Sequence, residues 1–149
     1  FNYGAEKYSR VRQTYRYSVT LCTVIATIFF ICFQFFPHQI VGIFGNGSDL
    51  YFHFAEKYLR IFMLMTFANG IQPMSACFFT SIGKARLGVI MSLTRQVLFL
   101  LPLIVIFPVF FGIDGVMYAG PIADTSAFVL AVVFARRELG IMKAAEQTV

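Results

Sequence analysis

Charged side chains are scarce in this sequence, and tryptophan is absent. Asp, Glu, Lys and Arg make up 13% of the 149 residues, whereas hydrophobic residues make up 58% and 19 residues are phenylalanine. Soluble domains carry about 25% charged residues. This shortage excludes an ordinary soluble domain and indicates a chain that lies in the lipid bilayer.

Cysteine and histidine are also few. Cys22, Cys32 and Cys77 lie in apolar runs without CxxC or Cys/His spacing, and His38 and His53 stand alone. We therefore expect no disulfide, no metal site and no cofactor. The sequence also lacks a nucleophile beside a base, a pair of acids and a glycine-rich phosphate loop, so we do not expect an enzyme.

Long apolar runs take the place of these groups. Residues 17–36 and 61–82 contain no charge, residues 87–111 contain only Arg95, and residues 116–135 contain only Asp124. At about 1.5 Å per residue each run is long enough for a hydrocarbon core of about 30 Å. We predict an all-α membrane protein with four transmembrane helices over these ranges.

The positive charges are distributed unevenly around these spans. Ten of the twelve cations fall on or near one side, and only Lys57 and Arg60 fall on the other; the ten are Lys7, Arg10, Arg12, Arg16, Lys84, Arg86, Arg95, Arg136, Arg137 and Lys143. By the positive-inside rule both termini are expected to be cytoplasmic, with residues 1–16 as an amphipathic segment on that side. Topology thus accounts for the net charge of +5, and we expect no nucleic-acid partner.

The first connection and the start of the chain carry further expectations. The stretch DLYFHFAEKYLR predicts a short helix near the membrane surface, capped by Ser48 or Asp49. The chain starts at Phe1 without a methionine or a signal peptide, so we expect it to be cut from a longer protein.

The second span contains the stretch FANGIQPMSACFF. Pro73 lacks an N–H and clashes with the carbonyl of Asn69, which predicts a kink beside Asn69, Gly70 and Gln72. Broken helices of this kind build substrate and ion sites in transporters, and Met74 adds a flexible apolar side chain. The alternative is that Pro73 only bends the helix and that Asn69 and Gln72 hold neighbouring helices together.

The fourth span carries two features, a ridge of small residues and one acid. Small side chains recur every fourth residue at Gly115, Ala119, Ala123, Ala127, Ala131 and Ala135, which predicts close approach of another helix. Asp124 lies about 18 Å from the cytoplasmic end of its helix and Arg95 about 13 Å from the end of the preceding one. Because a lone charge at this depth is costly, we predict that Asp124 and Arg95 pair or share a polar network. The pair is either purely structural or takes part in proton or cation coupling.

Several stretches together resemble the multidrug and toxic compound extrusion (MATE) family, in its bacterial, firmicute-like branch. They are FNYGAEKYSRVRQTYRYSV, YLRIF, QPMSACFFTSIGKARLGVIMSLTRQVLFLLPL and FGIDGVMYAGPIAD, of which the run from GKA to PIAD is the most specific. The resemblance implies a twelve-helix exporter in the bacterial inner membrane, built from two six-helix lobes, that exchanges organic cations for protons or sodium ions. The four spans look like the last four helices of the second lobe, so the partners would be the lipid bilayer, the missing first lobe and first helices of the second lobe, and organic cation substrates.

The resemblance also marks the site residues and one departure. The kinked helix lines the second-lobe cavity in the family, which assigns Asn69, Gln72, Pro73 and Met74, with Arg95 and Asp124, to a substrate or ion pathway. No Asp or Glu lies between residues 61 and 82, so the identity of the coupling ion, H⁺ or Na⁺, stays open. Two other functions remain as alternatives: a flippase for lipids or lipid-linked polysaccharides from the same superfamily, and a non-transporting four-helix scaffold.

Overall fold

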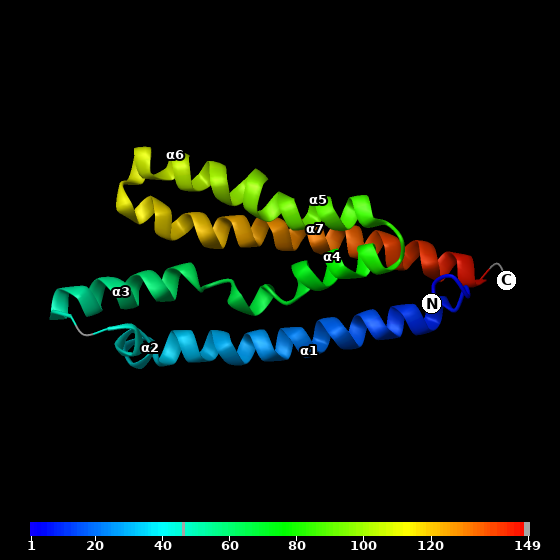
Figure 1. The fold of residues 1–149 in the computed structure, drawn as a ribbon, viewed down its shortest axis with the longest axis horizontal. Coiled ribbons are helices and arrows are strands. Elements are labelled where there is room, and N and C mark those ends of the chain that lie inside the picture. The colour runs from blue at the N-terminus through cyan, green and yellow to red at the C-terminus, as the bar shows by residue number, and fades with distance from the viewer. Residues whose placement is uncertain (46, 148–149) are drawn as a thin grey trace.

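The computed structural model describes residues 1–45 and 47–147, and within these ranges every regular element is helical (Figure 1). The helices run back and forth along one long axis, and both termini lie at the same end of the bundle (Figure 1). Three helices are long and apolar enough to cross a membrane, and a bent pair makes a fourth candidate span. The prediction of an all-α membrane chain is confirmed.

The first helix, α1 (Tyr8–Phe35), starts well before the predicted span at residue 17. Residues 8–16 are therefore the first turns of this long helix, and only residues 1–7 lie ahead of it. It ends before Pro37, which starts the short helix α2 (Pro37–Phe44). A proline suits the first position of a helix because the N–H of that residue needs no partner within the helix.

The next helix, α3 (Asp49–Phe62), begins as predicted at Ser48, whose Oγ accepts a hydrogen bond from the N–H of Tyr51 at 3.4 Å. Asp49 in its first turn and Arg60 in its last turn both suit the helix dipole. The helix packs mainly against α7 and α2 and leads into the second span (Figure 1). Its placement near the membrane surface stays a prediction.

The second span is broken, but the break lies before Pro73. After α3 come a 3₁₀ turn, η1 (Thr66–Ala68), and then α4 (Ile71–Ser81), and the two halves are bent by 41°. Pro73 is the third residue of α4, where the N–H has no partner within the helix in any case. The predicted kink beside Asn69 and Gly70 is confirmed, and Pro73 lies in the first turn of the helix that resumes after it, where its missing N–H costs no hydrogen bond within that helix.

The third span runs from α5 (Ala85–Leu93) through a π-helical stretch, η2 (Thr94–Leu100), into α6 (Leu101–Phe111). The N–H of Leu101 bonds to the carbonyl of Gln96, five residues back. Pro102 follows directly and has no N–H to give to Leu98, so the wider turn avoids the clash that an α-helix would meet there. The sequence did not lead us to expect this π-helix.

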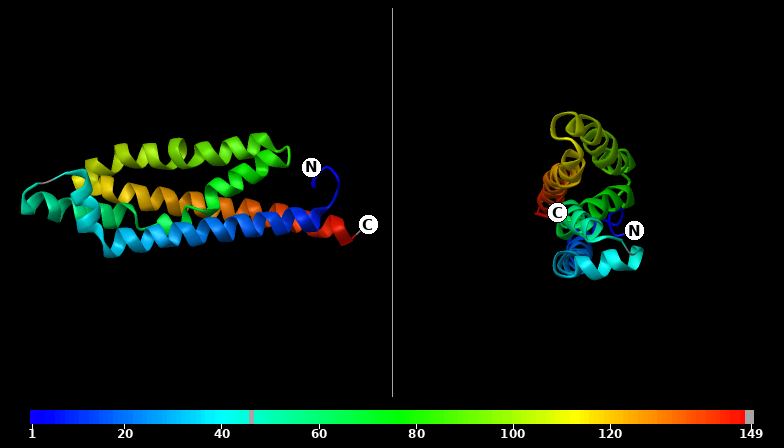
Figure 2. Two further views of the ribbon diagram at one scale, coloured as in Figure 1. Left: turned by 60° about the horizontal axis from the view of Figure 1, so that its bottom comes forward. Right: turned by 90° about the vertical axis from the view of Figure 1, so that its left-hand side faces the viewer.

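The last helix, α7 (Ile113–Gln147), is the longest and the best covered. All six members of the small-residue ridge are buried, as predicted. A Cβ on Gly115 would lie 2.5 Å from the backbone of Phe107, so α6 and α7 touch backbone to backbone there. Seen end-on, α1 and the α5–α6 helix lie on opposite flanks, with α7 and α4 between them (Figure 2).

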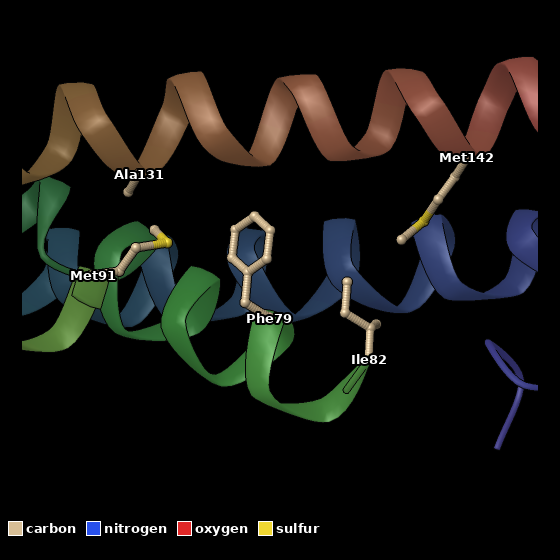
Figure 3. Packing of buried hydrophobic residues seen from close by; sticks show 5 residues of the cluster. All are labelled: Phe79, Ile82, Met91, Ala131 and Met142. Carbon is tan, nitrogen blue, oxygen red and sulfur yellow. The ribbon is translucent and has the colours of Figure 1, made fainter. Parts of the chain in front are cut away.

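An apolar cluster holds the half of the bundle near the termini. Phe79 of α4 and Ile82, directly after α4, point toward Ala131 and Met142 of α7, and Met91 of α5 completes the group (Figure 3). Phe79 is fully buried. By contrast, large apolar side chains of α1, α5 and α6 are exposed, as expected of surfaces that meet lipid or further helices.

Candidate functional site

The only charged groups that the described chain places in the middle of its spans are Arg95 and Asp124, and they form an ion pair. Arg95 Nε donates to Asp124 Oδ1 at 2.7 Å. The Asp124 side chain is 7% exposed and that of Arg95 is 32% exposed, so the carboxylate is enclosed by the helices while the guanidinium reaches the surface of the bundle. The predicted pairing across neighbouring helices is confirmed.

A third residue completes this group. Asn69 Nδ2 donates to Asp124 Oδ2 at 3.2 Å, so each carboxylate oxygen accepts a hydrogen bond from a different span. Asn69 is half-buried and lies between η1 and α4, at the break in the second span. We call Asn69, Arg95 and Asp124 the carboxylate network. It joins three of the four spans at one point.

Each member sits on a different kind of backbone. Asn69 is in the interrupted stretch between α3 and α4, Arg95 is in the π-helix η2, and Asp124 is inside the regular helix α7. Broken and π-helical segments within membrane spans are frequent at functional sites because they change side-chain direction and hydrogen-bonding capacity locally. Asp124 follows Pro121 of the same helix by three residues.

Packing fixes the position of the break against α1. A Cβ on Gly70 would lie 2.9 Å from the backbone carbon of Cys22 and 3.0 Å from its oxygen, so only glycine permits this approach. Ala68 is also buried. The chain on either side of Asn69 is therefore held directly on the neighbouring helix, which orients Asn69 toward Asp124.

The other predicted site residues lie elsewhere. Gln72 Nε2 donates to the carbonyl of Met91 at 2.9 Å and so joins α4 to α5. Pro73 is exposed in the first turn of α4. Met74 lines a separate cavity between α1 and α4. The structure brings together Asn69, Arg95 and Asp124 and separates Gln72, Pro73 and Met74 from them.

A second buried acid was missed from the sequence. Glu138 in α7 is 5% exposed, and both of its carboxylate oxygens lie 2.6 Å from Lys84 Nζ in the turn between α4 and α5. One signal was present: Glu138 lies three residues, roughly one helical turn, beyond Ala135 and so falls on nearly the same face as the buried ridge. This pair lies near the end of the bundle that carries the termini and makes no contact with the carboxylate network within the described residues.

Arrangement and chemistry together limit what the network does. It offers one buried carboxylate, one cation and one amide, which suits binding and release of a small cation or proton, or the holding of three helices in register. The described residues contain no group of three or more His, Cys, Asp or Glu side chains that could hold a metal ion.

Comparison with known proteins places this arrangement in a family. The MatE family model matches residues 1–106, which is more than half of the chain. A solved structure of the MATE multidrug transporter DinF-BH, determined as a complex with a ligand, aligns with a TM-score of 0.85 and 34% sequence identity, over 91% of this chain and 30% of that one. A second solved chain, described as protein A, aligns with the same values. No curated protein matches the sequence. The chain thus spans about a third of the length of the solved structures it matches, and it belongs to the MATE family.

Proposed function

We propose that this chain forms part of the second lobe of a secondary exporter that moves cationic amphiphilic compounds out of the cell by antiport with protons or sodium ions. Membership of the MATE family and the likeness to a multidrug transporter support export. The proposal of coupling to protons or sodium ions rests on the carboxylate network, because a buried ionisable group inside a membrane span is by default a functional group.

In this proposal Asp124 exchanges partners during the cycle. Arg95 acts as a tethered cation that neutralises the carboxylate when no other cation or proton is bound, and Asn69 keeps the second oxygen oriented. A proton or sodium ion that reaches Asp124 competes with Arg95 and loosens the link between η2 and α7. The exposed face of Arg95, at 32%, supports this exchange because the guanidinium has a direction in which to move.

The proposed orientation of the chain in the membrane follows from the positions of the cations. Both termini, the basic start of α1 and the turn with Lys84 and Arg86 lie at one end of the bundle (Figure 1). By the positive-inside rule this end faces the cytoplasm of a bacterial cell whose inner membrane holds the exporter. The first lobe and the remaining helices of the second complete the cavity in which substrate binds.

The test compares Asp124→Asn with the matched control Glu138→Gln in the intact protein. Both substitutions neutralise a buried acid that pairs with a cation, at 7% and 5% exposure, so their structural costs are similar. Reconstituted in vesicles, Asp124→Asn should abolish the proton or sodium flux that a cationic drug elicits, whereas Glu138→Gln should retain it.

Two readouts separate the outcomes. Equal loss of membrane abundance in both variants, with normal flux per molecule in Asp124→Asn, would show that the network is purely structural and would refute the coupling role. Deleting the gene should raise the susceptibility of cells to cationic drugs. Unchanged susceptibility, together with altered lipid distribution, would instead support the flippase alternative.

A further inference from the structure

A cavity separate from the carboxylate network lies between the first half of α1, α4 and the segment Phe1–Tyr3. Its volume is about 270 Å³. Val11, Met74, Phe78 and Ile82 give it an apolar wall, and Thr14 and Ser18 add hydroxyl groups on the α1 side. Nothing in the proposed export mechanism uses this cavity.

The chemistry of the wall restricts the ligand. Of the described side chains that line the cavity, none carries a charge. Its volume falls just below the range of about 300 to 1,000 Å³ that encloses a whole drug-sized molecule. The cavity therefore suits one uncharged portion of an amphiphile, such as an acyl chain with its ester and glycerol groups near the hydroxyls, and not a complete organic cation.

The charges beside the cavity are two cations, Lys7 and Arg10, and one acid, Glu6, whose N–H donates to the carbonyl of the lining residue Tyr3 at 3.1 Å. The backbone N–H of Lys7 donates to the carbonyl of Asn2, a lining residue, at 2.9 Å. Arg10 directly precedes Val11 and lies one helical turn from Thr14 on α1. Both cations are exposed. Two cations against one acid leave a net positive charge, which repels a cationic compound and attracts an anionic headgroup.

The position of the cavity along the bundle axis is consistent with binding the glycerol region of a lipid. Its α1 residues, Val11 to Ser18, straddle the predicted start of the first apolar run at residue 17, and on the other side its lining ends at Ile82, directly after α4 and beside the basic turn. This is the depth at which glycerol and ester groups of phospholipids meet the hydrocarbon. Basic residues at this level are the usual partners of anionic headgroups.

We propose that this cavity binds an anionic phospholipid of the cytoplasmic leaflet, with part of an acyl chain and the glycerol region inside and the headgroup beside Lys7 and Arg10. The choice of the cytoplasmic leaflet rests on the proposed orientation. The binding itself does not depend on export, so it is testable whether or not the transport proposal holds.

The experiment uses the intact protein in phosphatidylcholine nanodiscs with trace phosphatidylglycerol that carries a photoreactive diazirine on one acyl chain. After illumination, cross-linked peptides should cluster in residues 11–18 and 74–82. Unlabelled phosphatidylglycerol should compete, and phosphatidylcholine should not. Each basic residue near an anionic headgroup contributes about fivefold, so Lys7→Gln with Arg10→Gln should lower the preference for phosphatidylglycerol by up to about 30-fold.

A cavity-filling variant tests the position of the acyl chain. Ser18→Phe places a ring in the cavity and should remove the cross-links, while Ser92→Phe adds the same ring at an exposed serine of α5 and should leave them. Equal competition by phosphatidylcholine, or unchanged cross-linking in Ser18→Phe, would overturn the proposal. Competition by the organic cation tetraphenylphosphonium in place of phosphatidylglycerol would overturn it too, because the cavity would then be a drug pocket.

Discussion

Replacing Gly70 by alanine should destabilise the protein through a clash of backbones. The added methyl group would lie 2.9 Å from the backbone carbon of Cys22, 3.0 Å from its oxygen and 3.0 Å from the backbone nitrogen of Thr23. Ordinary contacts of a Cβ begin at 3.4 Å, so α1 and the broken span must separate by about 0.5 Å, the difference between 3.4 and 2.9. No side-chain rotation relieves this contact, because all three neighbours are main-chain atoms.

The expected cost is about 1 to 3 kcal/mol, the usual range for an overpacked interior. The displacement also affects Asn69, the residue next to Gly70. Its hydrogen bond to Asp124 is already long at 3.2 Å, so a small further separation breaks it. Gly70→Ala should therefore lower both thermal stability and transport per molecule. The measurement is a thermal melt of the detergent-solubilised intact protein by size-exclusion chromatography, with drug flux in vesicles as the second readout.

Gly140 provides the matched control. A Cβ there meets nothing within 4 Å, and Gly140 lies inside α7, so Gly140→Ala should be neutral or stabilise the helix by about 0.5 to 1 kcal/mol. If Gly70→Ala melts at the same temperature as the parent protein, the tight approach of α1 to the break is wrong. If both variants lose stability equally, loss of glycine as such is the cause and the contact with Cys22 is not.

Three further predictions follow from the same contacts. Arg95→Asp or Asp124→Arg alone should sharply lower membrane abundance, because leaving one buried charge unpaired costs about 3 to 5 kcal/mol. The double variant with both charges exchanged should recover part of that abundance, and no recovery would argue against direct pairing. A cysteine in place of the exposed Arg86, in a cysteine-free background, should react with an impermeant thiol reagent only from the cytoplasm, and labelling from outside would reverse the proposed orientation. Tyr15→Phe should lower the melting temperature by leaving the buried Ser75 hydroxyl without the 2.7 Å contact to Tyr15, at a cost of about 1 kcal/mol, whereas an unchanged melt would show that the bond from Ser75 to the carbonyl of Ile71 suffices.

The sequence predicted the spans and the ion pair because both depend on simple physical quantities. Length and apolarity set the spans, and the depths of Arg95 and Asp124 along neighbouring helices set the pairing. The buried face of α7 could be predicted equally well, since small residues at every fourth position point in nearly one direction. In each case one helix, or two adjacent ones, contained the whole signal.

The irregular segments were not predictable in the same way. Pro73 led us to expect the kink beside Asn69 and Gly70, but the longer departure from the α-helix between Phe62 and Ile71 was not expected, nor was the contact of Gly70 with the backbone of α1. That contact joins residues 48 positions apart, Cys22 and Gly70, and leaves no local pattern. The bond from Asn69 to Asp124 depends on it, so the third member of the network could not be assigned before the break was located.

Stiffness is distributed unequally around Asp124. Its own helix is continuous for 35 residues, while its two partners stand on the π-helix η2 and on the interrupted stretch of the second span. In α7 only the hydrogen bond that Pro121 cannot donate is missing, whereas a π-turn and a 3₁₀ turn interconvert with α-helix by shifting several hydrogen bonds. A displacement that separates the carboxylate from Arg95 or Asn69 therefore costs less in these two partners than in α7.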